Sequence, residues 1–460
     1  MTDTRIAIVG GGISGLSAAF TLQKLGVPYT LIEAERSLGG VIRTERRDGF
    51  LLEGGPDSML AQKPEGLALA RELGLGERLV PTNREHRDVY ILHGRRLHPL
   101  PEGMMLAVPT KVGPFLRSSL FSWPGKLRMG LDLVIPGRRD DADESIARFL
   151  RRRFGRQAVA RLGEPLLAGI HSGDPERLSM LATFPRFRRL EQQHGSLVRG
   201  MWKTMPAPRP RGEAPPAAFY SLRGGLRELV DALVLRLPRE AISTRLAVRS
   251  ITREDGAYSL ALDRGERIRA ERVIVAAPGP KIAPALAPVA PQAAQALAAI
   301  PFVSTATVLL GFRREDVGHL LEGYGLVVAA RERLRTTALS FVSTKFPSRA
   351  PEGHVLLRAF LGGARDGDVL GLSDQDLLAT VRREMKEPLG LRGEPVMTRV
   401  FRWPSGTPQL EVGHLERMSA AQASLPQGVF LSGAGVRSTG IPDAIADGTN
   451  AALAAAAGLA

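Results

Sequence analysis

The 460-residue sequence contains no cysteine, only 5% aromatic residues and no long apolar segment. Without cysteine, disulfides, cysteine-ligated zinc, iron-sulfur clusters and thiol redox chemistry are excluded, so any electrons that the protein handles must pass through an organic cofactor. The longest uncharged run, from Ile282 to Phe312, is interrupted by four prolines, and no transmembrane helix is predicted. The eight histidines have no spacing typical of metal ligands, so no metal site is expected.

Acidic residues are scarce relative to basic ones: 47 Asp and Glu against 62 Lys and Arg give a formal net charge of +15. A nucleic acid, an anionic membrane surface or a substrate with several carboxylates would attract such a chain, and an arginine-rich genome would also account for the charge. No helix-turn-helix, zinc finger or aromatic RNA-binding pattern accompanies the charge. Nucleic acid is therefore not an expected partner.

The N-terminal segment has no apolar leader, because Asp3 and Arg5 lie within its first residues. A secretory signal is not predicted, and a cytoplasmic location is expected. The length and an apolar content of 44% indicate a folded protein of two or three structural units. The sequence leaves the oligomeric state open.

The clearest motif is an apolar strand over residues 5–9 that runs into Gly10-Gly11-Gly12-Ile13-Ser14-Gly15 and then into a helix over residues 16–25. A second strand, over residues 29–32, ends at Glu33. In such a βαβ unit the glycines permit a tight turn, a close approach to a pyrophosphate and close helix packing, and the helix N-terminus attracts phosphate. Glu33 is placed to accept hydrogen bonds from ribose hydroxyls. The unit predicts a dinucleotide site.

A second glycine turn distinguishes FAD from NAD. Gly39-Gly40, Arg43 and the segment Glu53-Gly54-Gly55-Pro56 follow the first unit. In flavoproteins of the glutathione reductase and amine oxidase type a second glycine turn runs beside the pyrophosphate, whereas NAD enzymes do not need one. We therefore expect non-covalently bound FAD.

The C-terminus carries a related pattern. A strand over residues 428–432 is followed by Gly433-Ala434-Gly435, by Gly440 and by a helix of small residues over 444–457. The N-terminus of such a helix can stabilise the negative charge that a flavin gains on reduction. The two chain ends are therefore predicted to build one domain, completed by a helix within residues 220–237 and three strands up to residue 276.

With these motifs placed, the sequence resembles the flavin monoamine oxidase superfamily and, within it, the protoporphyrinogen and coproporphyrinogen oxidases of haem synthesis. The resemblance spans nearly the whole chain and is carried by EGGPDSML at 53–60, LAGIHSGDPERLS at 167–179, YSLRGGL at 220–226, RWPSGTPQLEVGHL at 402–415 and GIPDAIADG at 440–448.

The resemblance implies an α/β fold: an FAD-binding Rossmann-like domain of the glutathione reductase/p-hydroxybenzoate hydroxylase type, a mixed-sheet substrate domain and a helical insertion. The predicted FAD-binding domain comprises residues 1–80, 215–280 and 425–460. The predicted substrate-binding domain comprises residues 81–105, 200–214 and 281–424. Residues 106–199 form the predicted helical domain, a candidate for membrane association.

The same resemblance implies the site residues. The FAD contacts would be Gly10, Gly11, Gly12, Ile13, Ser14, Gly15, Glu33, Ala34, Gly40, Val41, Arg43, Gly55, Pro56, Asp57, Ser58, Val248, Trp403, Thr439, Gly440 and Ile441. The substrate contacts would be Arg87, Gly169, Ile170, Tyr324, Gly325 and Leu326. A guanidinium fork suits a carboxylate, so Arg87 is expected to pair with a substrate propionate. No residue is expected to act as a catalytic nucleophile, acid or base.

The sequence departs from the family pattern in four places. Ser37 stands where an arginine is usual, Leu410 where a tyrosine is usual and Ala444 where a cysteine is usual, and the usual asparagine after the C-terminal strand is missing. These changes leave the FAD contacts intact and bear on the substrate.

The expected reaction is FAD-dependent oxidation of protoporphyrinogen IX to protoporphyrin IX, with coproporphyrinogen III to coproporphyrin III as the alternative. The bridging methylenes carry weak C–H bonds, so hydride can pass to flavin N5 without a strong base, and pyrrole protons can leave to water or to a carbonyl such as that of Gly169. Three two-electron transfers complete the oxidation. Dioxygen is the expected acceptor, with a quinone or another acceptor left open.

Three rival functions and the role of one surface segment remain open. A flavin amine oxidase would be expected to show an aromatic cage, which the low aromatic content disfavours, and a carotenoid desaturase is a further enzyme of this fold. A non-catalytic scaffold is disfavoured by the intact glycines and Glu33. The segment from Phe115 to Leu133 mixes apolar and basic residues and suits either a membrane interface or a helical lid.

Overall fold

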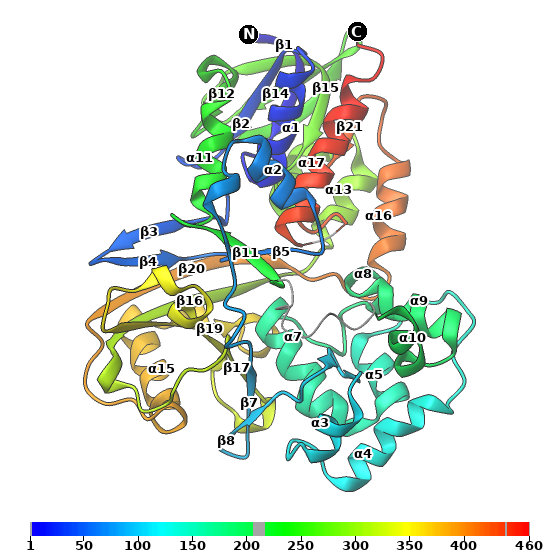
Figure 1. The fold of residues 1–460 in the computed structure, drawn as a ribbon. Helices are drawn as coiled ribbons and strands as arrows, with labels where there is room; N and C mark the ends of the chain where they lie inside the picture. Colours follow the sequence, from blue (N-terminus) through cyan, green and yellow to red (C-terminus); the bar gives the residue numbers. More distant parts are fainter. Residues whose placement is uncertain (1, 206–216, 438, 460) are drawn as a thin grey trace.

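A computed structural model describes residues 2–205, 217–437 and 439–459. Figure 1 shows one sheet with its helices at the top, a second sheet at the lower left and a group of helices at the lower right. Of the predicted segment 200–214, residues 206–214 lie outside the described residues.

The upper sheet contains strands from both ends of the chain. Its order is β12 (Ile242–Thr244), β2 (Tyr29–Glu33), β1 (Thr2–Val9), β15 (Arg267–Val275), β14 (Ala257–Leu262) and β13 (Val248–Glu254), and β21 (Val429–Leu431) also pairs with β15. The pairs β12–β2, β2–β1, β1–β15 and β15–β21 are parallel, and the pairs β15–β14 and β14–β13 are antiparallel. The strands predicted near the two chain ends thus share one sheet.

Both faces of the upper sheet are buried, because successive residues of its strands are apolar and their side chains point to opposite faces. Ile6 and Ile8 of β1 face one core, and Ala7 and Val9 face the other. The first face is covered by α1 (Ile13–Lys24), α2 (Glu65–Glu72), α11 (Arg227–Leu235) and α17 (Ile441–Ala456). The second face is covered by α12 (Gly279–Leu286), α13 (Pro291–Ala298) and α16 (His414–Ala423). These last three helices pack on the upper sheet although they fall mainly within the segment 281–424.

The lower sheet is mixed. Its order is β20 (Met397–Pro408), β16 (Phe302–Arg313), β19 (His354–Gly362), β18 (Thr336–Phe341), β17 (Gly325–Val328), β7 (Val89–His93) and β8 (Arg96–Pro99). Only the β17–β7 pair is parallel among these neighbours. Helix α15 (Asp374–Leu389) covers one face, where Leu377 packs in one core with Leu357 and Ala359 of β19. Leu356 and Phe360 of β19 pack in other cores, toward the rest of the molecule.

The helical region forms a core that also includes side chains from β7, β17 and β18 of the lower sheet. Its helices are α3 (Val112–Arg117), α4 (Trp123–Gly130), α5 (Ile146–Phe154), α6 (Arg156–Ala158), α7 (Glu164–His171), α8 (Met180–Thr183), α9 (Pro185–His194) and α10 (Leu197–Thr204). Fully buried Arg153 is held by Asp132, to which its Nε donates at 2.6 Å. Helix α10 passes the predicted boundary at residue 199. In the described part of the chain, no helix has the length and apolarity needed to cross a membrane.

Short strands join the upper and lower halves (Figure 1). They are the hairpin β3 (Thr44–Arg47) and β4 (Phe50–Glu53), and the small sheet β5 (Met59–Leu60), β11 (Phe219–Leu222) and β6 (Leu79–Pro81). Phe50 and Leu52 of β4 pack against Leu309 of β16 and Met397 of β20. The loop of residues 54–58 leaves this junction.

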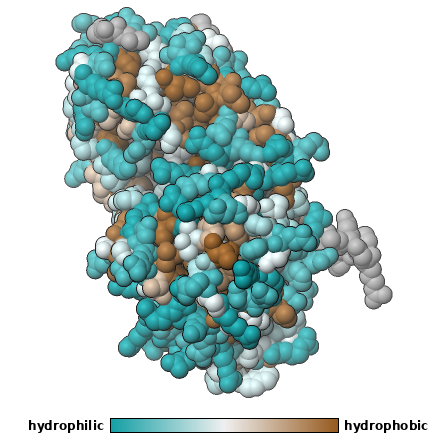
Figure 2. All heavy atoms as spheres, turned by 90° about the vertical axis from the view of Figure 1, so that its left-hand side faces the viewer, coloured by the Kyte–Doolittle hydropathy of each residue, from teal (hydrophilic) through white to brown (hydrophobic). Residues whose placement is uncertain are grey.

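The surface is mainly polar on the side that Figure 2 shows, which is the left-hand side of Figure 1. Hydrophilic side chains predominate over the lower half, and the largest apolar areas lie over the upper half.

Candidate active site

The first glycine turn is held by close backbone contacts. Gly10 has φ +112°, and a Cβ there would lie 2.8 Å from the backbone of Ala276 in the loop after β15. A Cβ on Gly15 would lie 1.9 Å from the carbonyl oxygen of Gly10. A Cβ on Gly12 would meet no atom within 4 Å, so open space adjoins this turn at the N-terminus of α1. A phosphate group fits such a position, because free N–H groups and the positive end of the helix dipole face it.

Glu33, at the end of β2, marks the adenosine side of the predicted site. Its carboxylate accepts hydrogen bonds from the backbone N–H of Gly11 at 2.6 Å and of Glu35 at 2.7 Å. The backbone of Leu246 donates to the Glu33 carbonyl at 3.0 Å, so the segment leading to Val248 runs beside it. The structure thus brings Glu33 and Val248 to one side of the first turn, with Ala34 exposed next to them.

The second glycine turn lies against the first. The backbone N–H of Gly39 donates to the carbonyl of Gly11 at 2.8 Å, and a Cβ on Gly40 would stand 3.5 Å from Gly12. Next to this turn, the carbonyl of Val41 lies so close to Gly55 that a Cβ on Gly55 would be 1.8 Å away. The two turns and the loop of residues 54–58 therefore form one continuous row.

An aromatic side chain closes this row. The indole N–H of Trp403, on β20, donates to the carbonyl of Gly54 at 3.0 Å. The guanidinium of Arg43 lies 5.5 Å from the centre of the Trp403 ring, and Phe401 stacks on Trp403 at 6.4 Å. Phe401 is not among the predicted residues, since a single aromatic in an apolar strand carries no local signal.

The C-terminal glycine loop meets the N-terminal helix directly. The hydroxyls of Ser14 and Ser432 are 2.6 Å apart and buried, and a Cβ on Gly448 would lie 2.1 Å from the carbonyl of Ser14. The backbone N–H of Gly433 donates to Asp447 at 2.8 Å. Helices α1 and α17 pack together at this point (Figure 1).

Gly440 is the N-cap of α17, and Thr439 and Ile441 flank it. The carboxylate of Asp443, in the first turn of this helix, pairs with the ammonium of Lys63 at 2.5 Å. The predicted residues 439–441 are thereby placed between the loop after β5 and the C-terminal strand. We call residues 10–15, 33, 39–41, 54–58, 403 and 439–441 the cofactor frame.

A buried charge cluster supports the cofactor frame from the lower sheet. Lys345, at the end of α14 (Val342–Lys345), lies 2.9 Å from both carboxylate oxygens of Asp57 and 3.3 Å from the Ser58 hydroxyl. Arg358 of β19 lies 3.6 Å from Asp57 and donates to the carbonyl of Gly55. Burial alone would raise the pKa of the Asp57 carboxyl, but Lys345 and Arg358 outweigh it and hold that pKa below its ordinary range.

Lys345 and Arg358 are not predicted by the motifs. The only sequence signal for Arg358 is a single charge inside the apolar run HVLLRAFLG, which indicates a buried arginine without naming its partner. Lys345 has no such signal, because it lies in a polar turn and its partner Asp57 is 288 residues away in sequence.

The predicted substrate residues fall into two groups. Tyr324 donates from its hydroxyl to the carbonyl of Asn83 at 2.7 Å, and its backbone N–H donates to Asp88 at 2.7 Å, next to Arg87. Gly325 has φ +148°, and Leu326 beside it is buried. Arg87 itself is exposed. This group therefore lies at one end of the β17–β7 pair.

The second group is on α7, which packs on the same sheet. A Cβ on Gly169 would lie 2.9 Å from Val327 of β17 and 3.1 Å from Ala338 of β18, whereas Ile170 is 66% exposed. Glycine at 169 thus lets α7 approach the sheet closely. The roles of all these residues in binding remain predictions.

Two histidines of the family motifs have different surroundings. The Nε2 atom of fully buried His414 lies 3.0 Å from the carbonyl of Val436, and burial lowers its pKa. His171 ends α7, and burial, together with the charge of Lys63, lowers its pKa to about 4. The imidazole of His171 is therefore neutral at neutral pH. Its carbonyl accepts from the Gln409 amide at 3.2 Å.

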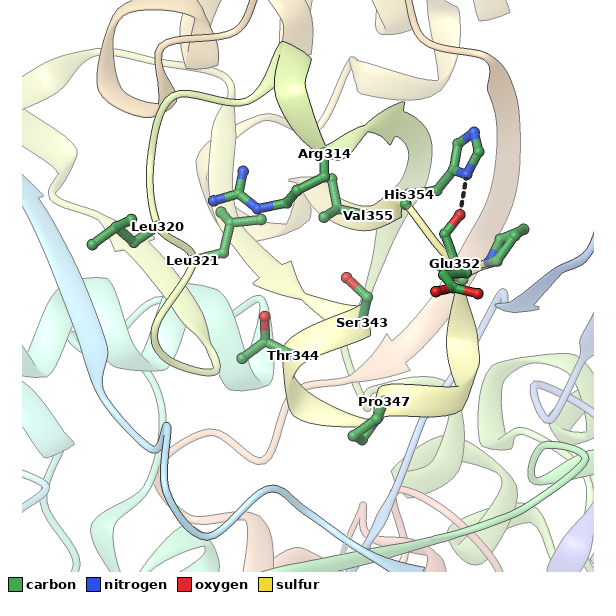
Figure 3. A pocket seen from close by; sticks show the side chains of 12 residues that line it. Arg314, Leu320, Leu321, Ser343, Thr344, Pro347, Glu352, His354 and Val355 are labelled. Carbon is green, nitrogen blue, oxygen red and sulfur yellow. Dashed lines mark hydrogen bonds between the residues drawn. The ribbon is translucent and has the colours of Figure 1, made fainter.

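A separate pocket lies at the far end of the lower sheet. Arg314, Leu321, Ser343, Thr344 and His354 are among its lining residues, where β16 ends and β19 begins (Figure 3). It contains none of the predicted site residues. The guanidinium of Arg314 is already bonded to the carbonyls of Val317 and His319, so the pocket offers no free cation from that side chain.

The cofactor frame fits FAD. Glu33 lies at the adenosine side, and the open space at the N-terminus of α1 suits the pyrophosphate. The loop of residues 54–58 and the Trp403 indole lie at the opposite end of the frame. The close backbone contacts at Gly15 and Gly55 leave no room for side chains there.

Comparisons with known proteins agree with this geometry. The family model for flavin containing amine oxidoreductases matches residues 13–456. The chain is 38% identical over 458 residues to the coproporphyrinogen III oxidase of Bacillus subtilis, covering 96% of each protein. It is 32% identical to the chloroplastic protoporphyrinogen oxidase of Nicotiana tabacum, covering 93% of this chain and 80% of that protein.

A solved structure extends the match to the fold. A protein of Exiguobacterium sp. 255-15, provisionally described as a protoporphyrinogen oxidase, superposes with a TM-score of 0.87 at 33% identity and 98% coverage of both chains. The predicted α/β fold class and the FAD cofactor are confirmed. The chain is therefore an FAD-dependent oxidoreductase that belongs to the flavin-containing amine oxidoreductase family and, within it, to the group of protoporphyrinogen and coproporphyrinogen oxidases.

Proposed function

We propose that the chain oxidises coproporphyrinogen III to coproporphyrin III. The observation that carries this proposal is the match over 96% of the chain to a relative named coproporphyrinogen III oxidase, at 38% identity. The sequence alone does not decide between the two porphyrinogens, and protoporphyrinogen IX is the first expectation, but a relative named protoporphyrinogen oxidase is less similar, at 32% identity. The substrate with four carboxylates also suits a chain with a net charge of +15 better than the one with two.

The chemistry asks little of the protein's own side chains. Bound FAD supplies the hydride acceptor. The chain has to orient each methylene of the substrate and exclude competing reactions. Trp403 and the loop of residues 54–58 fix one side of the site, and His171 stays neutral near it at neutral pH. The last carbonyls of a helix have no intrahelical partner, so that of Gly169, in the last turn of α7, can accept a hydrogen bond from a pyrrole N–H, whose proton then leaves to water.

The experiment is an anaerobic single-turnover assay in which each porphyrinogen is mixed with the FAD-loaded protein and the flavin absorbance is followed. We expect coproporphyrinogen III to bleach the flavin faster than protoporphyrinogen IX. Faster bleaching by protoporphyrinogen IX would reverse the choice of substrate. Absence of bleaching by both would overturn the proposal. Repeating the assay with dioxygen admitted tests the proposed acceptor by the return of the flavin absorbance.

Protoporphyrinogen IX is the second candidate substrate. It is sparingly soluble, and an exposed apolar surface that touches a membrane would help the protein to reach it. Trp123 and Leu127 of α4 and Val134 just after it are 64%, 71% and 71% exposed, whereas Phe121 is buried in the helical core. Lys126 of α4 lies 4.6 Å from the centre of the Trp123 ring. We propose that this face touches the surface of a cytoplasmic membrane. Trp123→Glu should then reduce the fraction of protein that sediments with anionic vesicles. Equal sedimentation of the parent and the Trp123→Glu variant would reject membrane contact.

A further inference from the structure

The charge cluster of Asp57, Lys345 and Arg358 holds more positive than negative charge. The side chains are 12%, 12% and 5% exposed. Among the described residues, Asp57 is the only acid within ion-pair distance of either cation. One carboxylate thus faces two cations in a place with little access to water.

The neighbouring groups do not restore the balance. Glu53 is buried, accepts from the Thr44 hydroxyl and from the backbone N–H of Leu226, and burial raises its pKa to about 7. Arg349, also buried, donates to neutral acceptors: the Ser221 hydroxyl at 2.8 Å and the carbonyl of Leu222 at 2.9 Å. At neutral pH the region therefore keeps an excess positive charge.

Such an excess is costly, because an unpaired charge loses its hydration when it is buried. Groups of this kind are found most often where a function uses the charge. An anion bound next to the cluster would offset much of the free-energy cost of burying the excess positive charge.

The register of β19 shows where the cluster faces. Leu357 and Ala359 point to the core under α15, and Arg358 between them points to the opposite face. There Arg358 donates to the carbonyl of Gly55, in the loop that Val41 and Trp403 also contact. The charge cluster and the predicted flavin contacts thus share one loop of five residues.

We propose that Lys345 and Arg358, held in place by Asp57, stabilise the negative charge that FAD gains when it accepts a hydride, and so raise its reduction potential. Two electrons and one proton enter the flavin as hydride, and one negative charge stays on its pyrimidine side. The cluster exchanges neither electrons nor protons, so these are positioning residues. The inference rests on the proposed placement of the flavin beside Gly55 to Ser58, and it does not depend on which porphyrinogen is the substrate.

The test uses FAD-loaded protein without substrate and has two readouts: the two-electron midpoint potential against a reference dye and the dissociation constant of sulfite. Sulfite donates its sulfur lone pair to flavin N5, and the displaced electron pair leaves the same negative charge on the flavin. Lys345→Met should weaken sulfite binding at least tenfold and lower the potential by the corresponding ~30 mV. Asp57→Asn should shift both readouts in the opposite direction, because it leaves two cations unopposed.

Two controls separate charge from packing. Lys345→Arg keeps the charge and should stay near the parent values. Lys386→Met removes one exposed charge from α15, on the far face of the lower sheet, and should change neither readout. If Lys345→Met and Asp57→Asn move the potential in the same direction, or leave it unchanged while FAD stays bound, the inference is wrong. If Lys345→Met does not hold FAD, Asp57→Asn decides alone. A failure of both porphyrinogens to reduce the flavin would overturn the proposed function without affecting these results.

Discussion

In the upper half of the molecule the candidate site is made of backbone, whereas on the lower sheet it is made of side chains. The cofactor frame depends on glycines whose Cβ atoms would fall 1.8 to 2.9 Å from other backbone atoms at Gly10, Gly15 and Gly55. The charge cluster depends on three ionised side chains from distant parts of the chain. A glycine packed against backbone tolerates no side chain, whereas the strength of an ion pair changes by degrees with each substitution. The two halves should therefore respond to mutation in different ways.

The largest effect is expected at Gly15. A side chain there would collide with the carbonyl of Gly10, so Gly15→Val should cost more than about 3 kcal/mol and abolish FAD binding. The measurement is the flavin absorbance of the purified protein together with its urea midpoint. Gly130→Ala is the matched control, since a Cβ on that helical glycine would meet no atom within 4 Å, and this variant should keep both values. A yellow, stable Gly15→Val protein would contradict the close backbone packing.

A smaller effect is expected where the chain ends meet. Ser432→Ala leaves the buried Ser14 hydroxyl without its partner and should cost about 1 to 3 kcal/mol, whereas Ser14→Ala should cost less, because the Ser432 hydroxyl also bonds to Asp447. The double variant removes both hydroxyls and should cost clearly less than the sum of the two. Urea unfolding of the four proteins gives this coupling energy. Additive costs would mean that the two hydroxyls do not interact.

The junction between the halves should respond to pH through Glu53. Burial raises its pKa to about 7 from an ordinary value of 4.5. Between these values the folded chain keeps a proton that the unfolded chain has lost, so the contribution of Glu53 to the free energy of unfolding falls as pH rises. Glu53→Gln mimics the protonated form and should gain about 2 kcal/mol relative to the parent between about pH 5 and about pH 7. His171, whose lowered pKa acts in the opposite direction, is present in both proteins and cancels. Parallel stability curves would show that Glu53 is not protonated in the folded chain.

The smallest effect is expected at Arg87. It is exposed, so an ion pair with a substrate carboxylate is screened, and Arg87→Ala should raise KM by at most about tenfold without releasing FAD. Steady-state kinetics with coproporphyrinogen III measure this change. Arg84→Ala, a nearby exposed arginine, serves as the control. Identical KM values for all three proteins would remove Arg87 from the site.

The comparison also shows what the sequence can predict. The turn at residues 10–15, the acid at Glu33 and the glycines near both chain ends are predictable from local spacing, because each turn imposes its requirement on neighbouring residues. These local units predict that the two chain ends build one domain, but not that β1 pairs with β15 and β15 with β21.

The lower sheet is less accessible to sequence reasoning. Lys345 and Arg358 meet Asp57 only after the whole chain has folded, and no local pattern records such a contact. Helices α12, α13 and α16 are a similar case: their sequences show that they are buried but not which sheet they cover. The substrate residues come from resemblance alone.

The most direct measurement is a crystal structure of the protein grown with FAD. We expect the pyrophosphate at Gly12, the adenosine beside Glu33, and the isoalloxazine ring between the loop of residues 54–58 with Trp403 and the N-terminus of α17 at Gly440. A flavin ring bound elsewhere, with Asp57 and Lys345 turned away from it, would contradict this expectation.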